Sequence, residues 1–380
     1  MDNLDQSEDS ASLEERLTSS APKRILSLDG GGIRGALTLG YLERFEAILR
    51  TRFSNPGLKL CEYFDLIGGT STGAIIASGL AIGMDASTIK RFYLDIGERV
   101  FAKRKLLKWE AWYDAEPLKQ ALESVFGDRT LGDPSIRTGL CIVTKRADTG
   151  SLWPLFNHPR GKFYEANKDF LLREVVRAST AVPTLFQPEE IEVSPGISGV
   201  FVDGGVSLAK NPSLQLFLIA TLSGYNFNWP IGEDRLLLVS LGTGAWRHAH
   251  SSVHRAKVWD WAKEVPSLLI EDADWQNQLL LHYLSRSPTP REFDIEVGDL
   301  SSDMLTPEPA LTYLRYDTWL EPESFDAMGL PELASEAISL RTMTDASIRY
   351  DLARIGERAA KLQVREEHFP AAFDSPLYPC

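Results

Sequence analysis

The sequence predicts an α/β fold in which a mainly parallel sheet is covered by helices on both faces. Short apolar runs typical of buried strands alternate with segments whose apolar residues recur at helical spacing, and this alternation favours a parallel sheet. Glycines follow several of the predicted strands, at Gly30, Gly68, Gly204 and Gly242. Sheets of this class bind ligands at the carboxyl ends of their strands. Hydrophobic residues make up 43% of the 380 residues, which is enough for a sizeable core.

The regular pattern begins after residue 22. Strands are expected at residues 25–28, 64–67, 140–144, 200–202 and 236–241. Helices are expected between them at residues 36–49, 74–82, 87–100, 115–125 and 170–178. The segment 74–82 is apolar nearly all round, as is typical of a helix buried on all sides.

Composition divides the chain into three parts. Residues 1–22 are acidic, rich in serine and poor in large hydrophobic residues, so they predict a disordered tail. Residues 23–245 carry the alternating pattern and predict the α/β domain. After residue 245 strand signals become sparse, and residues 246–380 predict a mainly helical C-terminal region packed on that domain. Its helices are expected at residues 258–270, 275–284 and 345–362.

Charge and cysteine content exclude some classes of protein. A net charge of −13 argues against DNA or RNA as the main partner, because phosphate binding usually needs a basic face. The three cysteines are widely spaced and odd in number, so neither a disulfide framework nor a zinc site is expected. The N-terminus lacks a secretory signal, and no apolar run is long enough to span a bilayer. A soluble, cytoplasmic protein is therefore expected.

A serine stands in a tight glycine turn after the second predicted strand. The segment Gly69-Thr70-Ser71-Thr72-Gly73 matches the G-x-S-x-G nucleophile elbow, in which a sharp strand-to-helix turn exposes the serine hydroxyl. Its flanking glycines avoid clashes that a Cβ atom would cause. The alternative is an ordinary turn, but the strand before it and the helix after it favour a nucleophile at Ser71.

The first glycine turn, Asp29-Gly30-Gly31-Gly32-Ile33-Arg34-Gly35, allows two interpretations. Gly30, Gly32 and Gly35 spell the dinucleotide fingerprint G-x-G-x-x-G, which requires an acidic residue about 20 positions later. Residues 50–57 instead form a basic, turn-rich segment. The second interpretation is an oxyanion hole made by glycine N–H groups at a helix N-terminus, and we favour it because a nucleophilic serine needs one.

A nucleophilic serine also needs a base. Nothing marks any of the six histidines as that base: His158, His248, His250, His254, His282 and His368. The stronger candidate is Asp203, in the segment Asp203-Gly204-Gly205 at the end of a predicted strand. An aspartate has an ordinary pKa of ~3.9, so this role requires an apolar site or a close hydrogen bond. Alone, the segment would be a simple turn.

These three blocks, in this order, resemble the patatin-like phospholipase family. The stretches Arg177–Phe186 and Val239–Gly244 also look like the family's sequences, so the resemblance covers roughly residues 23–245. It implies a patatin-like three-layer α/β/α core and a Ser–Asp dyad, with Ser71 as nucleophile and Asp203 as its base. It also implies an oxyanion hole at Gly30–Gly35 and no metal or other cofactor.

The implied reaction is hydrolysis of acyl esters in phospholipids or related lipids through an acyl-enzyme. Such an enzyme would be peripheral at a membrane when active, and the cationic, aromatic segment Phe101–Trp109 is a candidate for that contact. Similar bacterial proteins serve in anti-phage defence and are switched on by cyclic oligonucleotides. By analogy, a small nucleotide activator is a hypothesis for this chain.

Two other classes of function remain as alternatives. The glycine fingerprint keeps open a dinucleotide-binding oxidoreductase of the Rossmann type. A catalytically silent storage or scaffold protein could keep the patatin-like fold, although Ser71 and Asp203 are both present.

Overall fold

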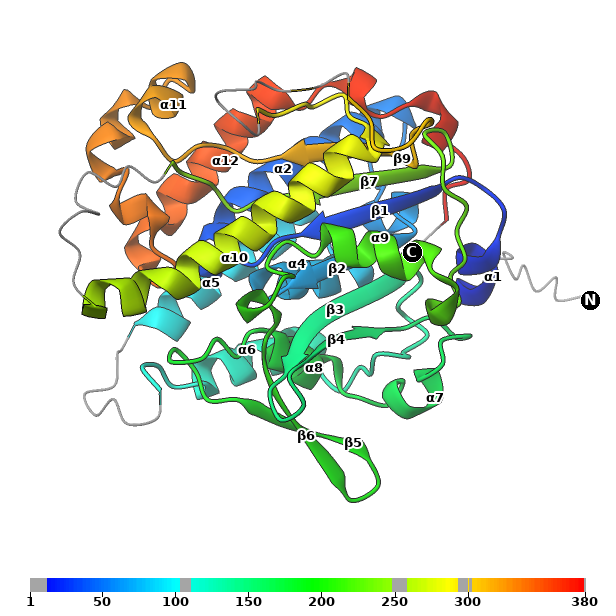
Figure 1. The fold of residues 1–380 in the computed structure, drawn as a ribbon, viewed down its shortest axis with the longest axis horizontal. Helices are drawn as coiled ribbons and strands as arrows, with labels where there is room; N and C mark the ends of the chain where they lie inside the picture. The colour runs from blue at the N-terminus through cyan, green and yellow to red at the C-terminus, as the bar shows by residue number, and fades with distance from the viewer. Residues whose placement is uncertain (1–11, 103–110, 248–257, 293–299, 301–302, 379–380) are drawn as a thin grey trace, which may run out of the picture.

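The computed structural model describes residues 12–102, 111–247, 258–292, 300 and 303–378. Within them, a nine-stranded sheet lies between two layers of helices (Figure 1). The strands are β1 (Lys23–Leu28), β2 (Leu66–Thr70), β3 (Gly139–Arg146), β4 (Ser151–Phe156), β5 (Glu189–Ser194), β6 (Ile197–Asp203), β7 (Leu236–Leu241), β8 (Ser285–Arg286) and β9 (Leu311–Tyr316). Their order in the sheet is β5-β6-β3-β2-β1-β7-β9-β8, with β4 paired to β3.

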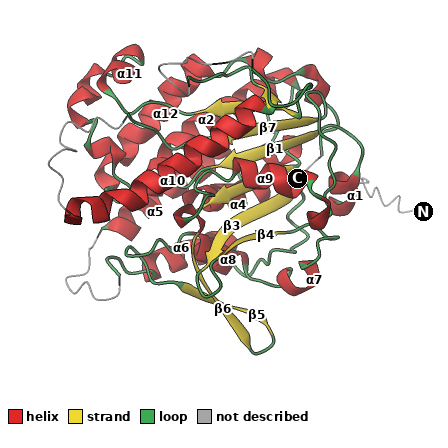
Figure 2. Cartoon of the chain, viewed as in Figure 1, coloured by secondary structure: helices red, strands yellow, loops and turns green. Residues whose placement is uncertain are grey.

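Helices connect these strands and cover the sheet (Figure 2). They are α1 (Leu13–Thr18), α2 (Gly35–Arg52), α3 (Leu60–Tyr63), α4 (Thr72–Ala81), α5 (Ala86–Phe101), α6 (Glu116–Phe126), α7 (Tyr164–Asn167), α8 (Leu172–Ser179), α9 (Ser213–Thr221), α10 (Val258–Tyr283), α11 (Pro322–Ala327) and α12 (Arg349–Gln363). Short 3₁₀ turns, such as Gly32–Arg34 and Gly204–Val206, link several of them.

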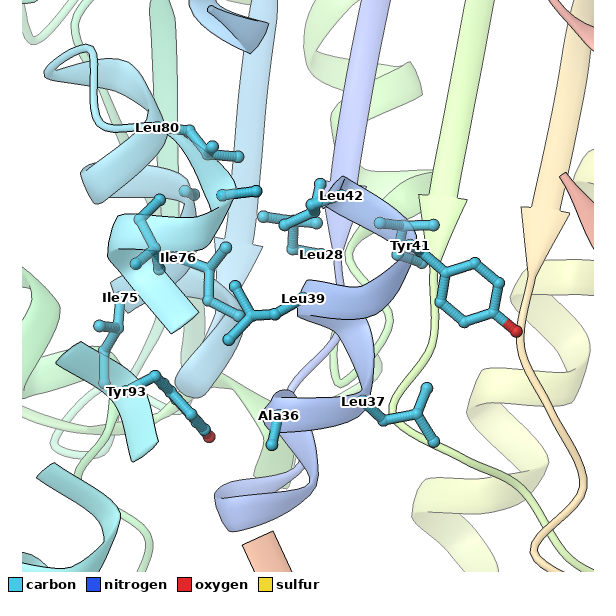
Figure 3. Close-up of a cluster of buried hydrophobic side chains, with 14 of the residues drawn as sticks. Leu28, Ala36, Leu37, Leu39, Tyr41, Leu42, Ile75, Ile76, Leu80 and Tyr93 are labelled. Carbon is cyan, nitrogen blue, oxygen red and sulfur yellow. The ribbon is translucent and has the colours of Figure 1, made fainter. Parts of the chain in front are cut away.

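The strands alternate their side chains between two hydrophobic cores, because successive residues of a strand point to opposite faces. In β1, Leu26 and Leu28 face the larger core with α2, α4, α5 and α12, whereas Ile25 faces the core under α9. Figure 3 shows part of the larger core, where Leu28 lies beside Leu39 and Leu42 of α2. The predicted three-layer α/β/α arrangement is confirmed.

The centre of the sheet is parallel, and this alignment brings together the strand ends that carry candidate site residues. Strands β3, β2, β1, β7 and β9 run parallel in that order, whereas β4 and β6 run antiparallel to β3. Thr70, the last residue of β2, pairs with Val143, and the next residue of β3, Thr144, pairs with Asp203. The ends of β2 and β6 therefore meet at the carboxyl edge of β3.

The prediction of a tail over residues 1–22 is wrong for residues 13–18, which form α1. A reciprocal capping box between Ser12 and Glu15 starts this helix. Arg16 is buried and lies 3.3 Å from an Asp65 carboxylate oxygen. It also donates to the Phe64 carbonyl oxygen at 2.7 Å. The amino-acid composition of residues 1–22 gives no indication of this buried ion pair. Residues 1–11 lie outside the described residues.

The C-terminal region contributes to the sheet as well as to the helical layers. The strand β9, which pairs in parallel with β7, was not expected from the sequence. The helices expected at residues 258–270 and 275–284 are one helix, α10, with Pro266 inside it. In Figure 1, α10 and α9 cross the front of the sheet. The boundary at residue 245 stays a prediction.

Cys61 is disulfide-bonded, although no disulfide framework was expected, whereas Cys141 is free and buried. Widely spaced cysteines give no local sign of pairing, because the fold decides which of them meet. In the part of the chain that the structure describes, no helix has both the length and the apolarity needed to cross a bilayer.

Candidate active site

Ser71 occupies the sharp turn that its motif predicts. It lies between the end of β2 and the start of α4, with φ 57° and ψ −123°, a strained conformation for a residue with a side chain. The turn leaves no room beside its glycines. A Cβ atom on Gly69 would lie 2.2 Å from the Gly73 carbonyl carbon, and one on Gly73 would lie 2.2 Å from the Leu28 carbonyl oxygen. The glycines thus allow β2, α4 and β1 to meet at Ser71.

A second serine fixes the backbone of this turn. The Ser71 N–H donates to the Ser179 hydroxyl oxygen at 2.8 Å, and the Ser179 hydroxyl donates to the Val143 carbonyl oxygen at 2.7 Å. Ser179 is the last residue of α8. This relay ties the end of β2 to the end of β3 through α8, so the strained conformation of Ser71 is held from outside its own segment.

Asp203 ends β6 in the same place and is buried. Its Oδ1 atom accepts a hydrogen bond from the Gly205 N–H at 2.6 Å, whereas the buried Oδ2 atom has no hydrogen-bond partner among the described residues. Burial raises the pKa of this carboxyl to about 6, although the nearby Ser71 hydroxyl, the Gly205 N–H and the charge of Arg177 favour ionisation. A carboxylate oxygen without a hydrogen-bond partner, in a carboxyl group whose pKa is raised, can accept a proton near neutral pH.

The first glycine turn lies against Ser71, because a Cβ atom on Gly30 would be 3.2 Å from the Ser71 Cβ atom. Several of its N–H groups are already used. The Gly30 N–H donates to the Lys210 carbonyl oxygen at 2.9 Å, and the Ile33 N–H donates to the Met343 carbonyl oxygen at 2.9 Å. The N–H groups of Arg34 and Gly35 donate within the turn itself.

Gly31 and Gly32 are the residues of this turn whose N–H groups make no described hydrogen bond. Their neighbours exclude side chains at both positions. A Cβ atom on Gly31 would lie 2.3 Å from the Thr243 hydroxyl oxygen, and Gly32 has a φ of +59°. The Tyr93 hydroxyl donates to the Gly32 carbonyl oxygen, which fixes the orientation of that peptide. The turn therefore keeps two adjacent N–H groups available for an anion.

Ser71, Asp203 and the glycine turn share one cavity of about 150 Å³. Its wall is mostly apolar and comes mainly from α4, α5, α6, α10 and the segment after α8. The large apolar residues in the wall are Ile33, Ile75, Ile96, Val100, Phe101, Leu118, Val182, Leu185, Phe186, Val206, Ile270 and Met343. A long apolar chain would therefore fit with one end beside Ser71.

Not every residue of the glycine turn lines this cavity. Gly30, Gly31, Gly32 and Ile33 do, whereas Arg34 and Gly35 do not. Arg34 is buried, and it donates to the Arg341 carbonyl oxygen at 3.1 Å. Its guanidinium also lies 4.9 Å from the centre of the Trp246 ring. Burial lowers the pKa of Arg34 to about 10. Arg34 thus connects the turn to the C-terminal region instead of facing the cavity.

Asp29, at the start of the turn, forms a two-fold ion pair with Arg315 of β9. Its two carboxylate oxygens lie 3.1 and 2.7 Å from the guanidinium nitrogens. Arg315 also donates to the Ser240 hydroxyl oxygen at 2.8 Å. Burial raises the pKa of Asp29 to about 7, and the charge of Arg315 opposes that rise. This pair fixes the strand end from which the glycine turn departs.

Comparison with known proteins supports the resemblance on which the prediction rests. A family model described as patatin-like phospholipase matches residues 26–217, about half of the chain and the part that holds all three motifs. This chain belongs to the patatin-like phospholipase family.

Curated relatives of this family member match about three fifths of this chain, and the match covers less than two thirds of their own length. A cGAMP-activated phospholipase of Escherichia coli (strain TW11681) is 30% identical over 227 residues, which cover 58% of this chain and 62% of the relative. Patatin group J-1 of Solanum tuberosum is 27% identical over 250 residues and 62% of each chain. The solved structure of VipD from Legionella pneumophila covers 85% of this chain and 67% of its own, at 12% identity and a TM-score of 0.34, too weak a likeness to carry an argument.

In this patatin-like chain, no histidine of the described segments lines the cavity. His158 packs 4.4 Å from the Phe227 ring, and burial lowers its pKa to about 4. His368 hydrogen-bonds with the Tyr316 hydroxyl at 2.8 Å, and His282 is buried. His248, His250 and His254 lie outside the described residues.

Sequence reasoning missed several residues of the patatin-like site. Ser179 lies within the stretch Arg177–Phe186 that supports the resemblance, so its position was marked although its contact with Ser71 was not. Tyr93, Lys210 and Met343 gave no signal, because each reaches the glycine turn only through the fold. Of the segment Phe101–Trp109, Phe101 lines the cavity, and residues 103–109 lie outside the described residues.

Proposed function

We propose that this protein is a lipid acyl hydrolase that uses Ser71 and Asp203. One observation carries the proposal. Ser71, in a strained turn, shares an apolar cavity with a buried carboxyl and two available glycine N–H groups. A nucleophile, a base and an oxyanion site within one acyl-sized cavity are the parts that ester hydrolysis needs.

In the proposed mechanism the Ser71 hydroxyl oxygen attacks the ester carbonyl carbon while its proton passes to Asp203. The carbonyl oxygen becomes an oxyanion that accepts hydrogen bonds from the N–H groups of Gly31 and Gly32. When this intermediate collapses, the C–O bond to the alcohol breaks, and the departing oxygen takes the proton from Asp203. Water then attacks the acyl-enzyme and Asp203 accepts its proton. The bond between the acyl carbon and the Ser71 oxygen breaks, that oxygen takes the proton from Asp203, and the fatty acid leaves.

Labelling with a fluorophosphonate probe tests this assignment. Wild type should label, whereas Ser71→Ala should not, and Asp203→Asn should label far more slowly because the serine lacks its base. Ser78→Ala is a matched control, since Ser78 is another buried serine of α4 that lies outside the cavity wall. Wild type that never labels, with or without candidate activators, would contradict the proposal, as would full labelling of Ser71→Ala.

We propose further that the protein acts at a membrane surface. Trp261, Val265 and Leu269 recur every four residues along α10 and are 40%, 42% and 63% exposed, so they form an apolar stripe on one helix face. The next residue, Ile270, lines the cavity. A lipid surface is the partner that suits an apolar stripe leading to an acyl-sized cavity.

Replacing the three stripe residues with serine should weaken binding to phospholipid vesicles while leaving hydrolysis of a soluble short-chain ester unchanged. Leu279→Ser is the control, because Leu279 is an exposed leucine of α10 beyond the stripe. Equal vesicle binding by the triple variant and the control would contradict this role for α10.

We also propose that a cyclic nucleotide activates the enzyme, as part of an anti-phage response. The support is the similarity to the Escherichia coli relative that is named a cGAMP-activated phospholipase. Hydrolysis measured with a panel of cyclic dinucleotides tests this point. One or more of them should raise the rate in the wild type, and rates that no member of the panel changes would contradict it.

A further inference from the structure

Two of the described residues that line the cavity of Ser71 are charged, and these are Asp203 and Lys210. The other lining residues are apolar, glycine, serine, threonine or tyrosine. Arg34, the cation of the glycine turn, is excluded from the cavity and makes its contacts with Arg341 and Trp246. Among the described residues, Lys210 is therefore the basic residue that lines this cavity.

The backbone of Lys210 lies between the two motifs of the proposed active site. Its carbonyl oxygen accepts the Gly30 N–H at 2.9 Å, and its Cα atom would lie 4.0 Å from a Cβ atom placed on Gly205. The position of Lys210 is thus fixed by both the oxyanion turn and the loop of Asp203. Lys210, whose side chain is 18% exposed, also lines a second cavity of about 30 Å³ together with its partner Asp274.

The ammonium group of Lys210 has a partner, but the contact is loose. Its nitrogen lies 3.5 Å from Asp274 Oδ2, on α10. The other carboxylate oxygen of Asp274 accepts hydrogen bonds from the side-chain amides of Asn211 and Gln278, both at 2.9 Å. Asp274 is therefore held without Lys210, and the ammonium retains N–H groups that an anion could engage.

We infer that Lys210 anchors the phosphodiester of a glycerophospholipid substrate. This inference rests on the proposed function and adds a residue that recognises the substrate. In a glycerophospholipid, a few bonds separate the ester carbonyl from the phosphate, so a phosphate must lie close to the cavity when the ester is at Ser71. A partly buried ammonium binds a phosphodiester by charge-assisted hydrogen bonds. A neutral glyceride would gain nothing from Lys210.

Steady-state kinetics with two substrates of equal acyl chain test the anchor. One is a monomeric short-chain phosphatidylcholine and the other a neutral p-nitrophenyl ester. Lys210→Met should raise KM for the phospholipid about tenfold, with a much smaller change in KM and kcat for the neutral ester. Lys210→Arg should restore part of the affinity. Lys59→Met is the matched control, because Lys59 forms a 3.5 Å ion pair with Asp85 outside the cavity.

Asp274→Asn separates an anchor from a structural bridge. If Lys210 only holds α10 to the core, removing either partner should impair both substrates alike. If Lys210 is the anchor, Asp274→Asn removes a competing carboxylate and should lower KM for the phospholipid. Equal losses on both substrates, an unchanged KM for the phospholipid in Lys210→Met, or an effect only on the concentration of nucleotide needed for activation would each overturn the inference.

A binding experiment keeps this inference separate from the proposed reaction. An ether-linked phosphatidylcholine, which cannot be hydrolysed, should bind Ser71→Ala more tightly than Ser71→Ala/Lys210→Met by calorimetry. That difference would persist even if the wild type proved inactive on esters, in which case the hydrolase proposal alone would fail. Equal binding by the two variants would overturn the anchor whatever the enzyme hydrolyses.

Discussion

At the scale of single residues, the ionisation of Asp203 sets the pH range in which the proposed dyad works. Its pKa is raised by burial from 3.8 to about 6, and only the ionised carboxylate can accept the Ser71 proton. We expect kcat/KM for a soluble ester to fall tenfold per pH unit below about pH 6. A pH–rate profile checks this expectation, and an acid limb near pH 4 would contradict it.

The raised pKa of Asp203 also makes stability depend on pH, and in the direction opposite to that of activity. Because the folded pKa lies above the unfolded one, the folded state holds an extra proton between about pH 4 and 6. The stabilisation from Asp203 is therefore full at low pH and is lost as pH rises through this window. Asp203→Asn should flatten that part of the pH dependence of the free energy of unfolding, as measured by urea denaturation. A profile identical to wild type would exclude the shift.

A second prediction at this scale concerns the glycine turn. Gly31→Ala would place a Cβ atom 2.3 Å from the Thr243 hydroxyl oxygen, so the turn must move and misdirect its N–H groups. We expect kcat to fall about 10²- to 10³-fold, the usual cost of one oxyanion donor, with a smaller change in KM. Gly224→Ala is the control, because a Cβ atom there meets nothing within 4 Å. Equal kcat values for the two variants would contradict this role.

At the scale of elements, α1 is an integral part of the fold through Arg16. Asp65 pairs with both Arg16 and Arg24, and these charges hold its pKa below the ordinary value although burial opposes them. Arg16→Ala should lower the free energy of unfolding by about 2 kcal/mol. This is less than the ~3–5 kcal/mol for breaking a lone buried pair, because Arg24 remains.

Urea denaturation measures this change. Arg99→Ala is its control, since the exposed pair of Arg99 with Asp95 should contribute almost nothing. Equal stability of the two variants would show that α1 is not held by its ion pair.

The elements that could be predicted from the sequence are those whose local pattern matches their surroundings. The all-apolar segment 74–82 is the buried helix α4, and Ser71 and Asp203 were marked by the glycines that their turns require. In contrast, β9 includes the charged Arg315, which is buried with Asp29 and Asp317 as its ion-pair partners. Residues 271–274 lay between two expected helices, yet Asp274 is inside α10 and pairs with Lys210. A local sequence pattern gives no indication of partners that are distant in the sequence.

At the scale of the whole molecule, the fold extends well beyond the residues that carry the motifs. The helices α2 and α12 cross in direct backbone contact, since a Cβ atom on Gly356 would lie 2.1 Å from the Leu37 carbonyl oxygen. In addition, β9 covers the outer edge of β7. The residues after 245 therefore complete both the sheet and the larger core.

We expect a chain ending at residue 245 to lack a stable fold. It would leave Asp29 without Arg315 and would expose the face of α2 that contacts α12. Circular dichroism should show no cooperative unfolding for this fragment, and the fluorophosphonate probe should not label it. A fragment that labels like the full chain would contradict this dependence.

The long-range anchors of the glycine turn also bear on when the proposed activity can first appear during synthesis of the chain. Asp29 finds its partner 286 residues later in the chain, and Arg34 reaches a carbonyl group 307 residues later. A ribosome delivers the N-terminal residues first, so the serine motif emerges long before the segments that orient its oxyanion turn. We therefore expect the proposed hydrolase activity to appear only when almost all of the chain has been made.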